Sequence, residues 1–112
     1  MYFKSDDHKK LFLALKQKAG QGDDCEYTAA LYVLSTLGKP ILKYIQPDGI
    51  KFSSLFNDSI AWSSSERALI KLAAALFNAA RSPAYIDEVF YSLDEENTRV
   101  ALQGLELRYL MR

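Results

Sequence analysis

The chain has 112 residues, of which 49% are hydrophobic, 12% aromatic and 25% charged, a profile that indicates one globular domain spanning 1–112 and excludes a disordered segment. Fourteen basic residues balance fourteen acidic ones, which argues against broad electrostatic attraction to nucleic acid or anionic lipid. Cys25 is the only cysteine, which excludes an intramolecular disulfide and indicates a reducing, cytoplasmic setting.

The first predicted helix covers about residues 6–18. Ser5 precedes Asp6 and Asp7, so a capping side chain is followed by two carboxylates at the positive end of the helix dipole. The glycines that follow predict its end. The segment MYFKSDDHKK has neither the basic nor the apolar region of a signal peptide, and no apolar run is long enough to predict a membrane span.

The second predicted helix covers about residues 24–37 and ends at Gly38. It begins at Asp23 or Asp24, and apolar residues recur on two of its faces. A helix that is apolar on two sides is expected to lie between neighbours. A tiny hairpin is predicted near residues 44–52, around the QPDG turn, followed by a turn or two of helix in FSSLF.

The third predicted helix, at about residues 64–81, has the strongest apolar periodicity and is expected to be the central helix. Beside the apolar stripe, a narrow polar interaction strip remains, made of Arg67, Lys71, Asn78 and Arg81. A short helix is predicted next, with Ser82 as its cap and Pro83 in its first position.

The fourth predicted helix runs over about residues 94–110, starting near Ser92 or Asp94. Gly104 lies in its middle at a cost of about 1 kcal/mol relative to alanine, which predicts a close helix crossing. The four long segments and two or three short ones predict an all-α fold, a compact orthogonal or antiparallel helical bundle.

The segment WSSSER, at residues 62–67, looks most like a reactive loop but has the spacing of a capping box. Ser63 precedes Glu66 by three residues, so each side chain can bond the other's backbone N–H. Trp62 and Arg67 would then form a staple in which the indole packs on the arginine stem. The segment is therefore predicted to fasten the third helix.

Catalytic and metal-binding motifs are weak. His8 is the only histidine, which excludes a His–His metal pair, and a set of Asp7, His8 and Cys25 would place the thiol among carboxylates that oppose its ionisation. Paired carboxylates such as Asp23-Asp24 fit helix starts. Phosphate-loop and nucleophile-elbow motifs are missing from the sequence. We expect no catalytic residue, no cofactor and no metal site.

A helix-turn-helix can be drawn over residues 52–81, with Ser64, Ser65 and Arg67 at the front of a recognition helix. The second helix is apolar on almost every side, however, whereas a recognition helix needs a free face. Nucleic-acid binding is therefore the alternative to a non-catalytic protein-interaction or self-associating module, and an unrecognised enzyme is the third hypothesis. Seven tyrosines suit an interface.

Several scattered motifs resemble one family of short bacterial proteins. They comprise His8, the DGI at residues 48–50, Trp62-Ser63, the LFN at residues 76–78 and the GLELRY at residues 104–109. That family is classed as a domain of unknown function and is often associated with mobile elements. The resemblance implies a small bacterial helical protein and brings no catalytic residue.

Overall fold

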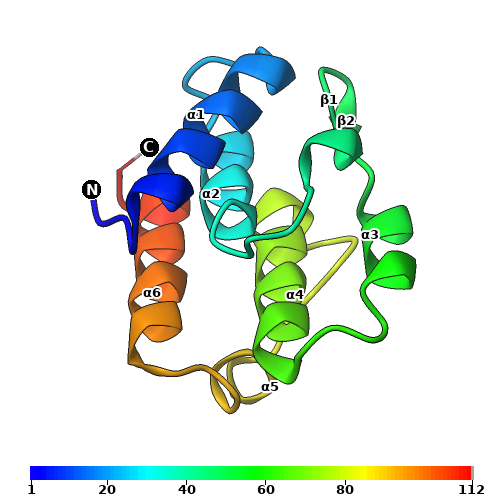
Figure 1. The fold of residues 1–112 in the computed structure, drawn as a ribbon, viewed down its shortest axis with the longest axis vertical. Coiled ribbons are helices and arrows are strands. Elements are labelled where there is room, and N and C mark those ends of the chain that lie inside the picture. The colour runs from blue at the N-terminus through cyan, green and yellow to red at the C-terminus, as the bar shows by residue number, and fades with distance from the viewer. Residues whose placement is uncertain (112) are drawn as a thin grey trace.

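The computed structural model describes residues 1–111 as a compact, mostly helical fold with six α-helices and one small sheet. The elements, in chain order, are α1 (Asp6–Ala19), α2 (Cys25–Leu34), the 3₁₀ turn η1 (Leu42–Tyr44), β1 (Ile45–Gln46), β2 (Gly49–Ile50), α3 (Phe52–Asp58), α4 (Ser64–Asn78), α5 (Ile86–Phe90) and α6 (Glu95–Tyr109). Figure 1 shows how they are arranged.

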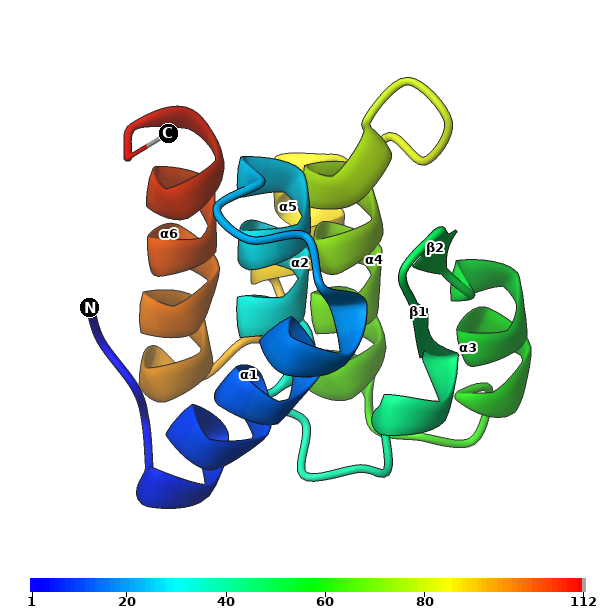
Figure 2. The same ribbon diagram turned by 90° about the horizontal axis from the view of Figure 1, so that it is seen from above.

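The most enclosed helix is α2, whereas the sequence favoured α4 as the central element. Figures 1 and 2 both place α2 between α4 and α6, with α1 across it. Its residues from Ala29 to Leu34 have no exposed surface. The two apolar faces predicted for this segment explain the position, because each needs a covering helix. The carboxyl-terminal half of α4 is open to solvent on one side, where Asn78 is exposed.

Helix starts follow the predicted caps. The Ser5 hydroxyl accepts from the His8 N–H, Asp24 from Tyr27 and Asp94 from Asn97. These side chains satisfy backbone donors that the first turn of a helix leaves without partners. Asp24 and Asp94 therefore decide the two starts that the sequence left open.

Helix ends are earlier than predicted in two places. The second helix ends at Leu34 instead of residue 37, because Thr36 and Leu37 donate to carbonyls three residues back in tighter turns. The third ends at Asn78 instead of residue 81, because its side-chain oxygen accepts from the Arg81 N–H and closes a turn.

The short helix after α4 begins at Ile86, so the predicted cap at Ser82 and start at Pro83 are wrong. The Ser82 N–H is used to close the turn on Asn78 O, and Tyr85, directly before the helix, has extended backbone angles. The Tyr85 N–H donates to the Glu88 carboxylate at 3.2 Å, which supports the later start.

The predicted hairpin is present but small. Ile45 pairs with Ile50 and Gln46 with Gly49 in an antiparallel register. The predicted close crossing at Gly104 of α6 is also present, against both α2 and α4: a Cβ on Gly104 would lie 2.8 Å from Val33 Cγ2 and 3.1 Å from Leu76 Cδ1. Within residues 1–111, no helix is both long enough and apolar enough to cross a membrane.

Candidate interaction surface

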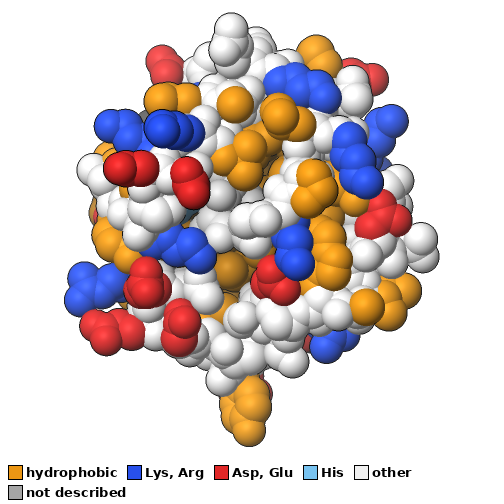
Figure 3. Space-filling model, in the orientation of Figure 1, with side chains coloured by type: hydrophobic (Ala, Val, Ile, Leu, Met, Phe, Trp, Pro, Cys, Tyr) orange, Lys and Arg blue, Asp and Glu red, His pale blue; other side chains and the backbone are white. Residues whose placement is uncertain are grey.

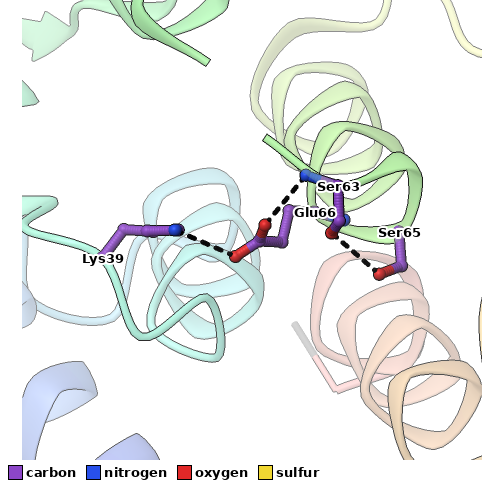
Figure 4. Close-up of polar contacts among 4 residues, drawn as sticks. All are labelled: Lys39, Ser63, Ser65 and Glu66. Atoms are coloured by element: carbon purple, nitrogen blue, oxygen red, sulfur yellow. Dashed lines mark hydrogen bonds and ion pairs between the residues drawn. The ribbon is translucent and has the colours of Figure 1, made fainter. Parts of the chain in front are cut away.

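The start of α4 is fastened by two reciprocal hydrogen bonds. The Glu66 N–H donates to the Ser63 hydroxyl at 3.2 Å, and the Ser63 N–H donates to Glu66 Oε1 at 3.0 Å. These are the two bonds of a capping box. Figure 4 shows the Glu66 carboxylate between the Ser63 backbone and Lys39. Burial alone would raise the pKa of Glu66, but the bonds from Ser63 and the nearby Lys39 ammonium lower it.

The cation over Trp62 is Lys39, and the predicted packing of Trp62 on the Arg67 stem stays a prediction. Lys39 Nζ lies 5.1 Å from the indole centroid and 3.7 Å from Glu66 Oε2. Lys39 follows α2, so one side chain ties the loop after α2 to the start of α4. The contacts of Lys39 with Trp62 and Glu66 join segments far apart in sequence, so local spacing could not predict them.

Arg67 and Lys71 of the predicted strip lie in a groove between α3, α4 and α5, here called the α5 groove. Its volume is about 490 Å³, and Phe56, Ile60 and Tyr91 also line it. Lys71 Nζ lies 3.6 Å from Glu88 Oε2, and Asp87 lines the same groove. The basic strip is therefore opposed by acidic side chains at this end.

Asn78 and Arg81, the other half of the strip, line a different hollow between α3 and the end of α4. Arg67, Lys71 and Asn78 belong to α4 and Arg81 to the turn after it, and Phe56 of α3 borders both hollows. The structure thus divides the predicted strip into two separate environments.

Three of the most exposed apolar side chains lie on and beside α5. Tyr85 is 75% exposed, Ile86 81% and Tyr91 87%, while Val89 on the inner side is only 2% exposed. Sequence reasoning treated this segment as a short helix and did not single out these residues. The available signal was the apolar Tyr85-Ile86 pair placed directly before two carboxylates, outside any apolar stripe.

A second, apolar hollow lies on the other side of α5, here called the α5–α6 hollow. Its volume is about 230 Å³. Side chains from α4, α5 and α6 line it, among them Leu72, Leu76, Ile86, Leu105 and Tyr109. An apolar hollow bordered by protruding apolar side chains is a common feature of protein-binding surfaces.

The proposed thiol–imidazole set is not assembled. His8 Nε2 lies 2.9 Å from the Tyr32 carbonyl, and Nδ1 accepts from the Lys4 N–H at 3.2 Å. Both ring nitrogens are occupied by backbone groups, so neither can take a proton from Cys25. The Cys25 thiol instead lies 3.7 Å from Arg108 Nη1. Among residues 1–111, no three His, Cys, Asp or Glu side chains are grouped to hold a metal ion.

Comparison of the chain with protein-family models, curated proteins and solved structures finds no match. The resemblance to a bacterial family of unknown function therefore stays a prediction.

Proposed function

We propose that the protein is a non-catalytic interaction module that self-associates through α5 and the α5–α6 hollow. The observation that carries the proposal is the exposure of Ile86 at the start of α5 and of Tyr85 and Tyr91, the residues that flank this helix. Full burial of one such side chain contributes roughly 1.5–3 kcal/mol. A partner that covers all three would gain a substantial part of the free energy needed for binding.

The surface is suited to a second copy of the same chain. Ile86 protrudes beside a hollow that is lined mainly by apolar side chains. In a dimer with two-fold symmetry, the same patch of each copy meets the other, so each copy can offer one protrusion and one hollow. Tyrosine suits such a patch because its ring is apolar and its hydroxyl can still bond to water or to the partner.

The proposal also covers the arrangement of the four long helices and the cellular compartment of the protein. We infer that α1, α2, α4 and α6 form an antiparallel or orthogonal four-helix bundle that acts as a rigid support for α5. The free, partly buried Cys25 supports a cytoplasmic location, because a reducing compartment keeps such a thiol unpaired.

Nucleic-acid binding through residues 52–81 remains the alternative, because α3 and α4 follow one another as helix, turn and helix. The two basic side chains that would face a DNA groove, Arg67 and Lys71, are less available for phosphate contacts than the sequence suggested. Lys71 is paired with Glu88, and α5 borders Arg67. Figure 3 shows positive and negative side chains interspersed on the visible face, without a broad field of one sign. Duplex binding needs such a field.

Light scattering across the micromolar range tests self-association. The measured mass of the natural protein should rise with concentration toward that of two copies. Ile86→Asp should keep the protein monomeric, because it places a charge in the contact. The change should leave the fold intact, because Ile86 is exposed and an acid at the first helical position suits the dipole.

Leu13→Asp is the matched control, because Leu13 is exposed on α1, away from α5. It should leave the concentration dependence unchanged. A natural protein that stays monomeric throughout would contradict the proposal. In that case, binding of Arg67→Ala/Lys71→Ala to mixed duplex DNA at low salt would test the alternative.

A further inference from the structure

The hollow that holds Asn78 and Arg81 differs in chemistry from both surfaces beside α5; it is here called the α3–α4 cleft. Its volume is about 440 Å³, within the roughly 300–1,000 Å³ range of small-molecule sites. One wall is the end of β2 and the first part of α3, and the other is the end of α4 with the turn after it. Figure 2 shows these two segments on the same side of the molecule, beyond α4 as seen from α2.

Aromatic rings run along this cleft. The centroids of Phe52 and Phe77 lie 5.8 Å apart, and those of Phe52 and Phe56 lie 6.2 Å apart. Phe77 is held from behind by Tyr27, whose ring meets it edge-on at 5.0 Å. All three phenyl rings line the cleft and keep part of their surface exposed. A planar ring entering the cleft would therefore find aromatic surface that the fold already holds in place.

Two cations border the same rings. Lys51 and Arg81 line the cleft and are exposed, and among residues 1–111 neither side chain forms an ion pair. No acidic side chain lines the cleft within the described residues. Asp48 lies near Tyr27, where its charge contributes to the raised pKa of that phenol after the larger effect of burial. Acidic side chains line the α5 groove beside its cations, whereas none lines the α3–α4 cleft within the described residues.

Neutral hydrogen-bonding groups complete the lining. Ser53, Ser54 and Ser82 contribute hydroxyls to the cleft. Asn78 accepts from the Arg81 N–H through Oδ1, which leaves its amide NH₂ free to donate. Such groups can bond the polar edge of a heterocycle, which a phenyl ring alone cannot recognise.

We propose that the α3–α4 cleft binds a nucleotide, with its base against the phenyl rings and its phosphate between Lys51 and Arg81. A planar aromatic ring joined to an anionic group is the ligand chemistry that matches unopposed cations beside exposed rings. The ligand can be a free mononucleotide or one nucleotide of a single strand. The inference is independent of self-association, because the cleft shares no residue with the α5–α6 hollow.

Titration calorimetry at low salt tests the ligand class with four probes: AMP, adenosine, inorganic phosphate and a short oligouridylate. AMP should bind, and adenosine and phosphate should each bind at least about tenfold more weakly, because each lacks one of the two recognised parts. Equal binding of phosphate and AMP would overturn the role of the rings. Failure of both AMP and the oligonucleotide to bind would overturn the proposal.

The oligonucleotide distinguishes the two sources of the ligand. Binding at least about tenfold tighter than AMP, and weakening steeply with salt, identifies a nucleotide of a single strand as the ligand. Comparable or weaker binding identifies the free mononucleotide. Both outcomes support the cleft as the site, provided that the variants below respond as expected.

Lys51→Ala/Arg81→Ala should weaken AMP binding at least about tenfold, because it removes both cations that face the phosphate. Lys9→Ala/Lys10→Ala removes two exposed charges from α1 and is the matched control. Equal affinities in the two double variants would overturn the site assignment.

Phe52→Leu should also weaken AMP binding without changing the weak binding of phosphate. Phe56→Leu, at a more exposed ring, gives the same test if Phe52→Leu does not fold. A folded ring variant with natural affinity for AMP would overturn the stacking assignment.

Discussion

At the scale of single residues, the cap at Ser63 shows what local spacing can predict. The two bonds of the box join residues three apart, so the pattern contains both partners. The third partner, Lys39, belongs to another segment and gives no local signal. Spacing therefore predicted the cap but could not predict that Lys39 lies over Trp62.

Ser63→Ala should lower the free energy of unfolding by about 1 kcal/mol, because the Glu66 N–H loses its acceptor. Urea denaturation measures the change. Ser54→Ala is a suitable control, because Ser54 is exposed within α3 and its replacement should cost little. Equal midpoints for the natural protein and Ser63→Ala would show that the cap contributes nothing.

His8 is a second feature decided at the residue scale. Burial is the main cause that lowers its pKa from 6.5, with a smaller opposing effect from the bond to the Tyr32 carbonyl and a further lowering by the Lys4 charge. The neutral ring accepts from the Lys4 N–H through Nδ1, and a proton on Nδ1 would break that bond. The folded protein therefore favours the neutral imidazole.

The contribution of His8 to stability should be complete above pH 6.5, the unfolded value, and should be lost as the pH falls toward the lower folded pKa. Below the folded pKa the loss should level off. The slope should not exceed about 1.4 kcal/mol per pH unit. Urea denaturation between about pH 7 and pH 5 measures it. His8→Gln should remove this part of the pH dependence, and an unchanged profile would contradict the assignment.

At the scale of elements, the long helices were predictable because caps and apolar periodicity agree over many residues. The ends were less predictable, because bonds to carbonyls three residues back follow α2, and a bond from the Arg81 N–H to the Asn78 side chain follows α4. The start of α5 was misplaced because Ser82 and Pro83 form a good local start signal. The Ser82 N–H donates to the Asn78 carbonyl and closes a turn after α4, and this neighbouring contact accompanies the later start at Ile86.

Gly104 lies where α6 packs against both α2 and α4. Gly104→Ala gains about 1 kcal/mol of helix propensity but forces a methyl group against Val33, whose overpacking costs about 1–3 kcal/mol. Val33 is fully buried and cannot move away easily. We expect a net loss of about 1 kcal/mol, measured by thermal or urea unfolding.

A double-mutant cycle isolates the cause of that loss. In a Val33→Ala background, the same Gly104→Ala change should cost less or become favourable, because the opposing methyl is gone. An equal cost in both backgrounds would mean that the two residues do not meet.

At the scale of the whole molecule, composition and periodicity predicted a compact, mostly helical fold, whereas the candidate surfaces could not be predicted. The α3–α4 cleft combines residues from two distant segments, and only their packing brings Lys51 and Arg81 to the same cleft. The amino-terminal segment gives another example. Tyr2 donates its N–H to Gln103 Oε1 at 2.8 Å and accepts from the Tyr32 hydroxyl at 2.5 Å. Figure 1 shows this end of the chain beside α6.

Tyr32→Phe should release residues 1–4 and lower stability by about 1 kcal/mol, because Tyr2 loses one of its two anchors. Amide hydrogen exchange should show faster exchange at Tyr2. Tyr44→Phe is the control, since Tyr44 bonds Asp58 at 2.5 Å and that bond raises its pKa to about 12. It should change stability without changing exchange at Tyr2. Unchanged exchange in Tyr32→Phe would rule out the anchor.

The enclosed position of α2 has a consequence for synthesis on the ribosome. One of its covering helices, α6, is the last helix of the described chain to be made. Until α6 leaves the exit tunnel, the face of α2 around Val33 has no permanent cover. The nascent chain therefore carries an exposed apolar helix until α6 can dock. Chaperone binding to nascent chains should be strongest in the interval between completion of α2 and release of α6.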